Sequence, residues 1–317
     1  MKTAMNSLRL VYPPISNQEA EWLKKDKEVE TLLRRSNLYM IAQRREARFV
    51  WDEDAIANPK DGRIPFDFEI PGIASGSGTL SIEKDVLRSD EIIYEFGDKL
   101  VRASTASDNE ALGEVLWWYS TESLLFSKWR GDKRIKGLDN FRDFTTYHLF
   151  YVGISTDQDS YQRLLEAGHH KRVAVLSNET QLVSDSRLTD EVILFFFESN
   201  PLFVHMFEDV EDCSSFGMDM PFTENQATAD AERAFTKFLD TQYNSIKYMA
   251  FPKGKGGLYD IGLARYAHTI AEDITFVTSS NSFRGAYGEF GIPGTGGADA
   301  ILIEGDKAEI YRASSEE

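Results

Sequence analysis

The first third of the chain shows two successive patterns of hydrophobic and polar positions. Residues 17–46 place Ala20, Leu23, Val29 and Leu33 at roughly helical spacing after a capping residue, Ser16 or Asn17, which predicts one long helix or two in series. Residues 48–105 contain short runs rich in β-branched and aromatic side chains, separated by Gly, Pro, Asp and Asn. This spacing predicts an antiparallel sheet or a small barrel, with turns at "GSGTL" and "GDK".

The middle of the chain predicts a different order of elements. Residues 107–129 return to helical spacing with an apolar face, and they are followed by an expected strand over 144–154, a helix over 158–170 and a strand over 172–177. An apolar helix is expected over about 188–206, although "VILFFF" also fits a buried strand, because periodicity cannot separate the two over so short a run. The acidic stretch that follows, "FEDVEDCSSFGMDMPF", is expected to form a loop and a domain boundary.

The last third combines a helix with short strands. Residues 225–244 predict a helix capped by Thr223 or Asn225, and "FPKGKGGLYDIG" predicts a glycine-rich loop leading into a second helix. Three further strands are expected, the last a hairpin on "GDK". The chain is therefore expected to be a mixed α+β and α/β protein of several domains: residues 1–136 with helices and an antiparallel sheet, a small central strand-helix-strand-helix domain over 137–215, and an α+β region over 216–317.

Composition narrows the classes of function. The chain has 317 residues, a formal net charge of -17 and one cysteine, Cys213. The negative charge argues against broad nonspecific binding to nucleic acid or anionic lipid, while leaving room for a local basic patch. One cysteine excludes an intramolecular disulfide and a cysteine-based zinc site, and the chain has no apolar run that would cross a membrane. A cytoplasmic location is the expectation.

The stretch from 147 to 172 carries the candidate chemistry. Tyr151-Val-Gly ends the expected strand, Arg163 follows on the expected helix, and His169 and His170 come soon after it. A tyrosine or histidine can relay a proton, and an arginine can bind a phosphate bidentately. One carboxylate can hold a Mg²⁺ that keeps most of its waters. Together these residue types supply the roles that phosphodiester hydrolysis needs.

In this order, "YVGIS", the arginine and the histidine resemble the core of the GIY-YIG nucleases over about residues 140–205. The resemblance implies a small α/β catalytic domain, an essential arginine at Arg163, and a metal-binding glutamate at Glu191, with Glu198 in reserve and Glu179 as a weaker candidate. It also implies Mg²⁺ or Mn²⁺ as the cofactor. No Gly-Ile-Tyr tripeptide lies upstream, so either Tyr147 takes the place of the family's first tyrosine or the chain lacks one.

Each of these residues also has a structural interpretation. Tyr151 fits a core aromatic residue, and Arg163 fits the solvated face of an amphipathic helix. The two histidines follow Gly168 at an expected helix C-terminus, where imidazolium faces the helix dipole favourably, and Glu191 fits the first turn of a helix for the opposite reason.

Two other stretches are candidate anion sites. A basic cluster surrounds one aromatic ring, Trp129, and is either a solvated connector or an arm that contacts phosphates and stacks on a base; its charged members are Lys128, Arg130, Lys133, Arg134 and Lys136. The second stretch places Lys253 and Lys255 among glycines, and it is either a plain loop or one that presents backbone N–H groups to a phosphate. The five histidines lack the spacing of a zinc site.

Two functions from different classes follow from the sequence. The first is a metal-dependent endonuclease acting on DNA rather than RNA, which, as the resemblance implies, would fit bacterial genome defence against viruses or mobile elements. The second is a noncatalytic acidic protein that binds a protein or nucleotide partner. A protein partner or a second copy of the chain stays open in both, and no membrane partner is expected.

Overall fold

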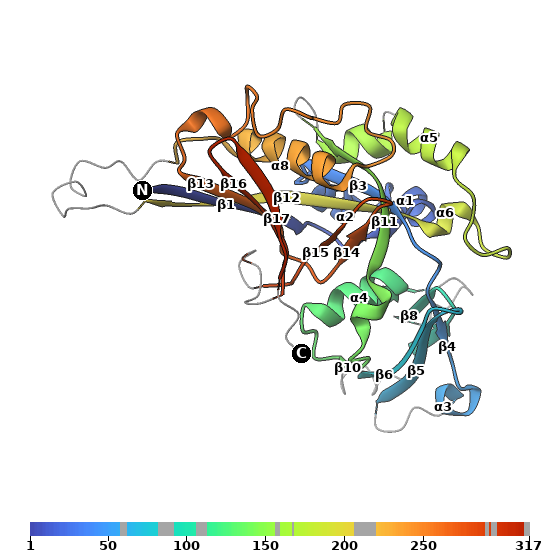
Figure 1. The fold of residues 1–317 in the computed structure, drawn as a ribbon. Helices are drawn as coiled ribbons and strands as arrows, with labels where there is room; N and C mark the ends of the chain where they lie inside the picture. The colour runs from blue at the N-terminus through green and yellow to red at the C-terminus, as the bar shows by residue number, and fades with distance from the viewer. Residues whose placement is uncertain are drawn as a thin grey trace. The chain divides into compact units, whose positions relative to one another are not determined.

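The computed structural model describes residues 1–57, 62–81, 92–105, 113–155, 159–166, 168–205, 220–288, 292 and 297–313 (Figure 1). The chain forms two compact units. Unit 1 comprises Met1–Arg44, Thr146–Thr180 and Arg187–Glu317, and unit 2 comprises Arg45–Thr145 and Gln181–Ser186. Unit 2 is therefore largely an insertion between two neighbouring strands of unit 1.

Unit 1 is built on a ten-stranded mixed sheet with the order β15-β14-β11-β3-β12-β1-β13-β16-β17, in which β2 also pairs with β12. The β1–β13 and β11–β14 pairs are parallel, and the other pairs are antiparallel. The strands are β1 Lys2–Leu10, β2 Ile15–Ser16, β3 Leu38–Gln43, β11 Thr146–Ile154, β12 Val192–His205, β13 Arg265–Ile270, β14 Thr275–Val277, β15 Ser282–Arg284, β16 Ala300–Glu304 and β17 Lys307–Tyr311.

Helices cover this sheet. They are α1 Asn17–Leu23, α2 Lys27–Leu33, the π-helical turn η3 Gln162–Glu166, α5 His170–Asn178, α6 Leu188–Glu191, α8 Glu224–Leu239 and the 3-10 turn η4 Tyr259–Ile261. Ser16 and Thr223 each close a capping box at the start of α1 and α8. The longest of these helices, α8, packs against β11 and β12.

The core of unit 1 lies on both faces of β3 and β12. All six residues of β3 are buried, as are the first six of β12. On one face, Tyr39, Ile41 and Phe196 belong to a cluster with Ala20 of α1 and Val175 of α5. On the other face, Phe195 packs edge to face on two further aromatic rings at 4.9 and 5.0 Å, those of Tyr147 and Phe276.

Unit 2 contains a four-stranded sheet, β10-β6-β5-β4, and a three-stranded sheet, β7-β8-β9. Its strands are β4 Arg48–Val50, β5 Arg63–Ile70, β6 Ala74–Ser81, β7 Ile92–Phe96, β8 Leu100–Thr105, β9 Val115–Ser120 and β10 Ile135–Gly137. Its helices are α3 Glu53–Ala57, α4 Thr121–Trp129 and the 3-10 turn η2 Phe141–Phe144. All strand pairs in both sheets are antiparallel.

The expected mixed α+β class with several units is confirmed. The strands expected within 48–105, the turn at 97–99, two helices in series over 17–33, the Thr223 cap of α8 and the β16–β17 hairpin are all present. The ten-stranded sheet takes strands from all three segments that the sequence suggested as domains.

Several elements differ from the prediction. Residues 38–43 form β3 rather than more helix, residues 115–120 form β9, and residues 265–270 form β13 rather than a second helix. The segment 172–177 belongs to helix α5, and 192–205 is a strand, as the alternative interpretation of "VILFFF" allowed. "GSGTL" lies inside β6 rather than in a turn. Most of the expected acidic loop, including Cys213, lies outside the described residues.

None of the helices in the described parts of the chain has the length and apolar character needed to cross a membrane.

Candidate functional site

Two tyrosines from adjacent antiparallel strands form the centre of the candidate site. Tyr39 of β3 lies opposite Gly153 of β11, and Tyr151 lies opposite Ile41. The two tyrosine rings are 6.0 Å apart. A Cβ atom at Gly153 would lie 2.6 Å from Cζ of Tyr39, which real Cβ atoms do not tolerate. The glycine after Tyr151-Val152 is therefore required because the ring of Tyr39 lies across β11 at this position.

His169 joins this pair from the start of α5. Its Nδ1 caps the helix by accepting a hydrogen bond from the backbone N–H of Arg172 at 3.4 Å, and its Nε2 lies 3.0 Å from the Tyr39 hydroxyl. Because Nδ1 accepts, the neutral ring carries its proton on Nε2 and donates it to Tyr39. Burial, helped by the positive charge of Arg163, lowers the pKa of His169 to about 4. The ring is therefore neutral at pH 7.

The hydroxyls of Tyr39 and Tyr151 continue this hydrogen-bond chain. Burial raises the pKa of both, and the bond between them raises that of Tyr39 while lowering that of Tyr151. Because the Tyr39 oxygen accepts the hydrogen bond of His169, its own O–H is left to donate to Tyr151. The direction of donation runs from His169 through Tyr39 to Tyr151, and it favours negative charge on Tyr151.

Arg163 lies at the end of β11, in the π-helical turn η3. Its Nη1 donates to the carbonyl of Ile154 at 2.8 Å, and its other N–H groups bond to no residue that the structure describes. Its positive charge lowers the pKa values of Tyr39, Tyr151 and His169. A half-buried guanidinium with open donors beside two hydroxyls is suited to bind an anion. Single π-helical turns frequently mark functional sites.

Glu232 of α8 is the carboxylate of this cluster. Its side chain is 8% exposed, and burial raises its pKa to about 7, against a hydrogen bond from Tyr248 and the positive charges of Arg233 and Arg163. Its negative charge in turn raises the pKa values of Tyr39 and Tyr151. The charge of Glu232 therefore acts on both tyrosines and on Arg163.

The segment after α8 holds Tyr248 at this site. The side chain of Asn244 bonds the N–H and the C=O of Val152, at 3.0 and 2.8 Å, as a neighbouring strand would. Tyr248 has a positive φ of 47°, which is uncommon for a residue with a large side chain. Burial, reinforced by the charge of Glu232, raises the pKa of Tyr248 to about 12.

Three predicted site residues join this cluster. Tyr151, Arg163 and His169 lie within it, and the exposed ring of His170 lies 5.2 Å from that of His169 at its border. The structural setting of His169 differs from the expectation: it begins helix α5 rather than ending one. Its contribution as an N-cap therefore replaces the expected interaction with a helix C-terminus.

Tyr147 does not join the site, because a β-bulge separates it from Tyr151. The pairing of β11 with β3 shifts register between Leu149 and Tyr151, which places these two residues on opposite faces of the sheet. Tyr147 shares the face of Leu149, where it is fully buried and its hydroxyl accepts a hydrogen bond from Arg44 at 3.1 Å. The tyrosine that lies beside Tyr151 on its own face of the sheet is Tyr39.

Glu191 also lies elsewhere. It is fully buried and accepts a hydrogen bond from the side chain of Gln43 at 3.1 Å. Gln43 is four residues along β3 from Tyr39, about 13 Å at the rise of a strand. Glu191 is therefore no part of the cluster around Tyr39, in which the carboxylate is that of Glu232. The reserve candidates are engaged on the surface, Glu198 with Arg35 and Glu179 with Tyr243.

The signal for Glu232 in the sequence is the spacing of the buried positions of α8. The buried positions of α8 include Thr228, Phe235 and Leu239, and Glu232 falls on the same stripe at the 3.6-residue repeat. A glutamate on the apolar stripe of an amphipathic helix is buried by the same packing. Tyr39 carried no such signal, because it lies within a segment that was expected to be helical.

The basic cluster at 128–136 lies in unit 2 and is mostly engaged. Trp129 is 5% exposed and packs against Phe126 at 5.6 Å, so its ring is not available to stack on a base. Lys128 pairs with Asp139 and Arg134 with Asp132, while Arg130 lies over the Phe126 ring. Lys133 and Lys136 are exposed.

Within the described residues, no three histidine, cysteine, aspartate or glutamate side chains gather in a group that could hold a metal ion. Comparisons of the chain with models of protein families, with curated proteins and with solved structures find no match.

Proposed function

We propose that the protein is a metal-dependent endonuclease that hydrolyses phosphodiester bonds in DNA, as the resemblance to GIY-YIG nucleases implies. One observation carries the proposal: Tyr39, Tyr151, the neutral His169 and Arg163, whose remaining donors bond no described residue, gather near the end of β11, and the buried carboxylate of Glu232 interacts with them electrostatically. These are the roles that phosphodiester hydrolysis requires, namely a base, an anion ligand and a metal ligand.

Tyr151 is the candidate general base. The hydrogen-bond chain from His169 through Tyr39 ends on its oxygen, and the charge of Arg163 adds to the stabilisation of a phenolate there. Burial acts in the opposite direction and keeps Tyr151 protonated at pH 7. The fraction in the base form therefore grows as the pH rises, and so should the rate of cleavage.

Arg163 is the candidate ligand of the scissile phosphate. Its Nη1 is held by the Ile154 carbonyl, which fixes the plane of the guanidinium while leaving the other N–H groups for two nonbridging oxygens. Charge that develops on these oxygens during hydrolysis would strengthen both bonds, which is the condition for lowering the barrier.

Glu232 fits the metal ligand that the proposal needs. Glu232 forms no ion pair with a described residue, and its burial raises its pKa to about 7 despite the charges of Arg233 and Arg163. A bound cation would stabilise the ionised carboxylate further. A single carboxylate suffices for Mg²⁺ or Mn²⁺, which retain most of their waters. Bound there, such an ion would supply positive charge to the phosphate and the leaving oxygen.

The proposed partner and location extend this function. DNA is the expected substrate, and the single cysteine fits a reducing compartment such as the cytoplasm. A role in defence against foreign DNA would follow if cleavage proves to be selective.

Plasmid cleavage in Mg²⁺ or Mn²⁺ tests the proposal. Arg163→Ala and Glu232→Gln should each lower the rate by about 10²–10³-fold. Glu198→Gln, which removes a surface carboxylate paired with Arg35, is the matched control and should cleave like the wild type. Cleavage that survives both site substitutions, or that persists in excess EDTA, would contradict the proposal.

A further inference from the structure

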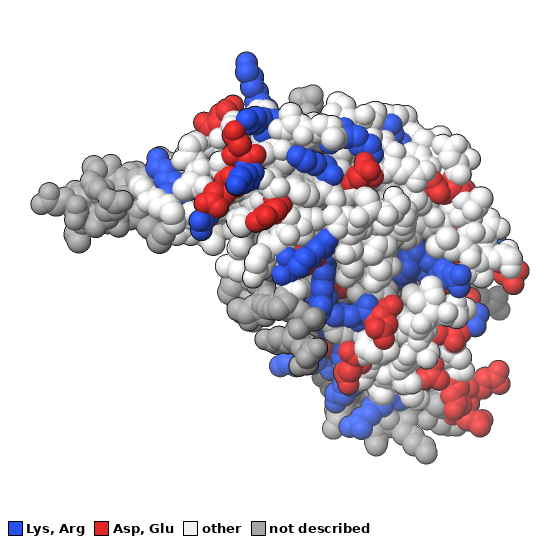
Figure 2. All heavy atoms as spheres, viewed as in Figure 1, with Lys and Arg blue, Asp and Glu red and all other residues white. Residues whose placement is uncertain are grey.

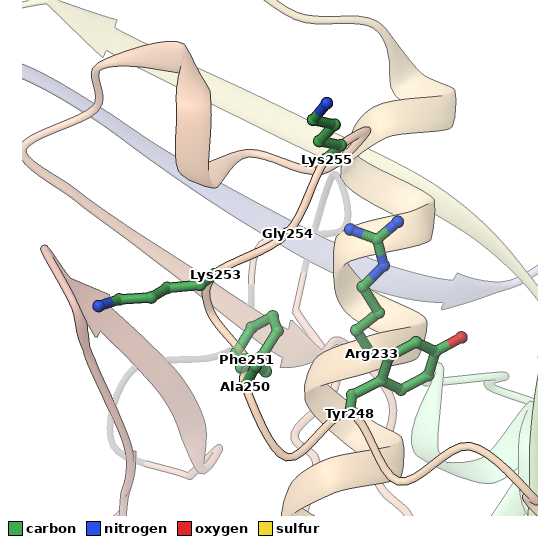
Figure 3. Close-up of a pocket in the computed structure, with 7 residues that line it drawn as sticks. All are labelled: Arg233, Tyr248, Ala250, Phe251, Lys253, Gly254 and Lys255. Carbon is green, nitrogen blue, oxygen red and sulfur yellow. The ribbon is translucent and has the colours of Figure 1, made fainter.

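A pocket of about 260 Å³ lies beside α8 (Figure 3). Arg233 and Tyr248 line one side, and the stretch from Phe251 to Lys255 lines the other. We call it the α8 pocket. It contains the glycine-rich stretch in which the sequence places Lys253 and Lys255, and the proposed cleavage site does not use it.

Hydrogen bonds with side chains of α8 hold both ends of the loop that forms the α8 pocket. Asp230 accepts a hydrogen bond from the backbone N–H of Leu258 at 2.7 Å and is itself bonded to the buried ring of His268 at 2.9 Å. Lys237 donates to the carbonyl of Phe251 at 2.7 Å. A Cβ atom at Gly257 would collide with the carboxylate of Asp230, so this close approach requires glycine. The pocket is therefore a built feature of the fold.

Arg233 presents its guanidinium to this loop. A Cβ atom at Gly254 or Gly257 would lie 3.3 or 3.1 Å from its Nη1, and the group lies 6.0 Å from the centre of the Tyr248 ring. Figure 3 shows the guanidinium beside the loop at Gly254, whereas the side chains of Lys253 and Lys255 both extend away from it. The absence of side chains at these two glycines thus lets the guanidinium pack directly against the loop, on the border of the pocket.

Two positive charges at the α8 pocket form no ion pair with any residue that the structure describes. Among the described residues, no carboxylate forms an ion pair with Arg233 or with the exposed Lys255. Lys253 differs, because it pairs with Asp306 at 2.7 Å. The chain has a net charge of -17, and basic and acidic side chains intermingle over the face seen in Figure 2. Cations that form no ion pair with a described residue can still attract an anion locally.

Tyr248 connects the α8 pocket to the proposed cleavage site. Its hydroxyl donates a hydrogen bond to Glu232, and its ring lines the pocket. Arg233, which also lines the pocket, directly follows Glu232 in α8. An anion in the pocket would therefore lie one side chain away from the carboxylate of the site. The backbone of a DNA strand presents one phosphate after another at short intervals, and its bases stack favourably on aromatic rings.

We infer that the α8 pocket binds a phosphate of the DNA strand adjacent to the phosphate that is cleaved, with Arg233 as the anion ligand and Lys255, which also lines the pocket, adding positive charge. The choice of DNA as the ligand rests on the proposed function. The pocket then positions the strand so that only one phosphate reaches Arg163 and Glu232. Arg233 and Lys255 are accordingly positioning residues that contribute to substrate affinity rather than to the chemical step.

Binding of a fluorescent DNA duplex, measured by anisotropy in EDTA over a range of salt concentrations, tests the inference without cleavage. Arg233→Met and Lys255→Met should each weaken binding by about tenfold and reduce the salt slope by about 1. Arg265→Met and Lys25→Met remove exposed charges elsewhere in unit 1 and should change neither quantity. Lys255 lies in an exposed loop, so its substitution keeps the test valid if Arg233→Met fails to fold.

Wild-type affinity and salt slope in both pocket variants would overturn the inference, as would a wild-type protein that binds no DNA. Cleavage assays separate this failure from failure of the proposed function. If the pocket variants raise KM with kcat unchanged, the positioning role is supported. If Arg163→Ala and Glu232→Gln abolish cleavage while the pocket variants behave like the wild type, the endonuclease stands and the pocket does not.

Discussion

Tyr39 and Gly153 lie directly opposite each other on β3 and β11, and the tyrosine ring extends across the glycine. This contact directs the Tyr39 hydroxyl to Nε2 of His169, 3.0 Å away. The glycine of the Tyr-Val-Gly element thus acts through the space that it leaves for a side chain on the neighbouring strand. That role predicts the effect of filling the space.

Gly153→Ala should displace the Tyr39 ring, because a Cβ atom at 2.6 Å from Cζ forces the ring to move. Overpacking of this kind costs about 1–3 kcal/mol of the free energy of unfolding. The cleavage rate should fall as well, since the displaced hydroxyl loses His169. Urea unfolding and plasmid cleavage measure the two effects.

A double-mutant cycle isolates the contact between the two residues. In a Tyr39→Ala background, Gly153→Ala should destabilise the protein less than it does in the wild type, because the obstructing ring is gone. Additive effects of the two substitutions would show that the glycine acts through something other than Tyr39.

Tyr39→Phe and Tyr147→Phe form a matched pair. Both remove a fully buried hydroxyl with a polar partner, His169 for Tyr39 and Arg44 for Tyr147, so each should cost about 1 kcal/mol of stability. Only Tyr39→Phe breaks the hydrogen-bond chain to Tyr151, and it should slow cleavage by about 10²-fold. Equal rates in the two variants would remove Tyr39 from the mechanism.

The β-bulge near Leu149 shows why the sequence pointed to Tyr147 rather than Tyr39. Two tyrosines four residues apart on a regular strand share a face, and only an extra residue in the pairing separates them. Such a bulge depends on the partner strand, which for β11 is β3. Unit 2 lies between these strands in the sequence, so no local pattern connects Tyr39 with Tyr151.

The elements that the sequence predicted correctly are those whose signals are local. The Thr223 capping box marks the start of α8, and the turn at Gly305 closes the β16–β17 hairpin. By contrast, the first six residues of β12 are all buried, so this part of the strand lacks the alternation that identifies a strand. The two valines of the short α5 segment favour a strand. The segment is a helix that begins at the cap formed by His169, and this cap is visible only in the folded protein.

Glu232→Gln should change how stability depends on pH. The folded-state pKa of Glu232 is raised from 4.5 to about 7, so the folded protein binds this proton more tightly than the unfolded chain does. The resulting stabilisation is fully present below pH 4.5 and is lost as the pH rises to about 7. The glutamine of the variant does not ionise, so the free energy of unfolding of the variant does not fall in this way. Relative to the wild type it should rise by up to about 3 kcal/mol over the same pH range.

Urea unfolding at several pH values between 4.5 and 7 measures that difference. Glu224→Gln, which removes a carboxylate from the first turn of the same helix, is the control for a change in charge on α8. A difference between Glu232→Gln and the wild type that stays constant with pH would show that Glu232 ionises as freely in the folded protein as in the unfolded chain.

His169 should remain neutral, with its proton on Nε2, throughout the range in which an ordinary histidine titrates. Burial lowers its pKa from 6.5 to about 4, and the capping bond to Nδ1 selects the tautomer. Because the unfolded chain binds this proton more readily, the contribution of His169 to stability is complete above pH 6.5 and is lost as the pH falls to about 4. Carbon-13 NMR shifts of the labelled ring report both charge and tautomer. A ring that titrates near 6.5, or that carries its proton on Nδ1, would reverse the direction of donation and remove the stabilisation of a phenolate at Tyr151.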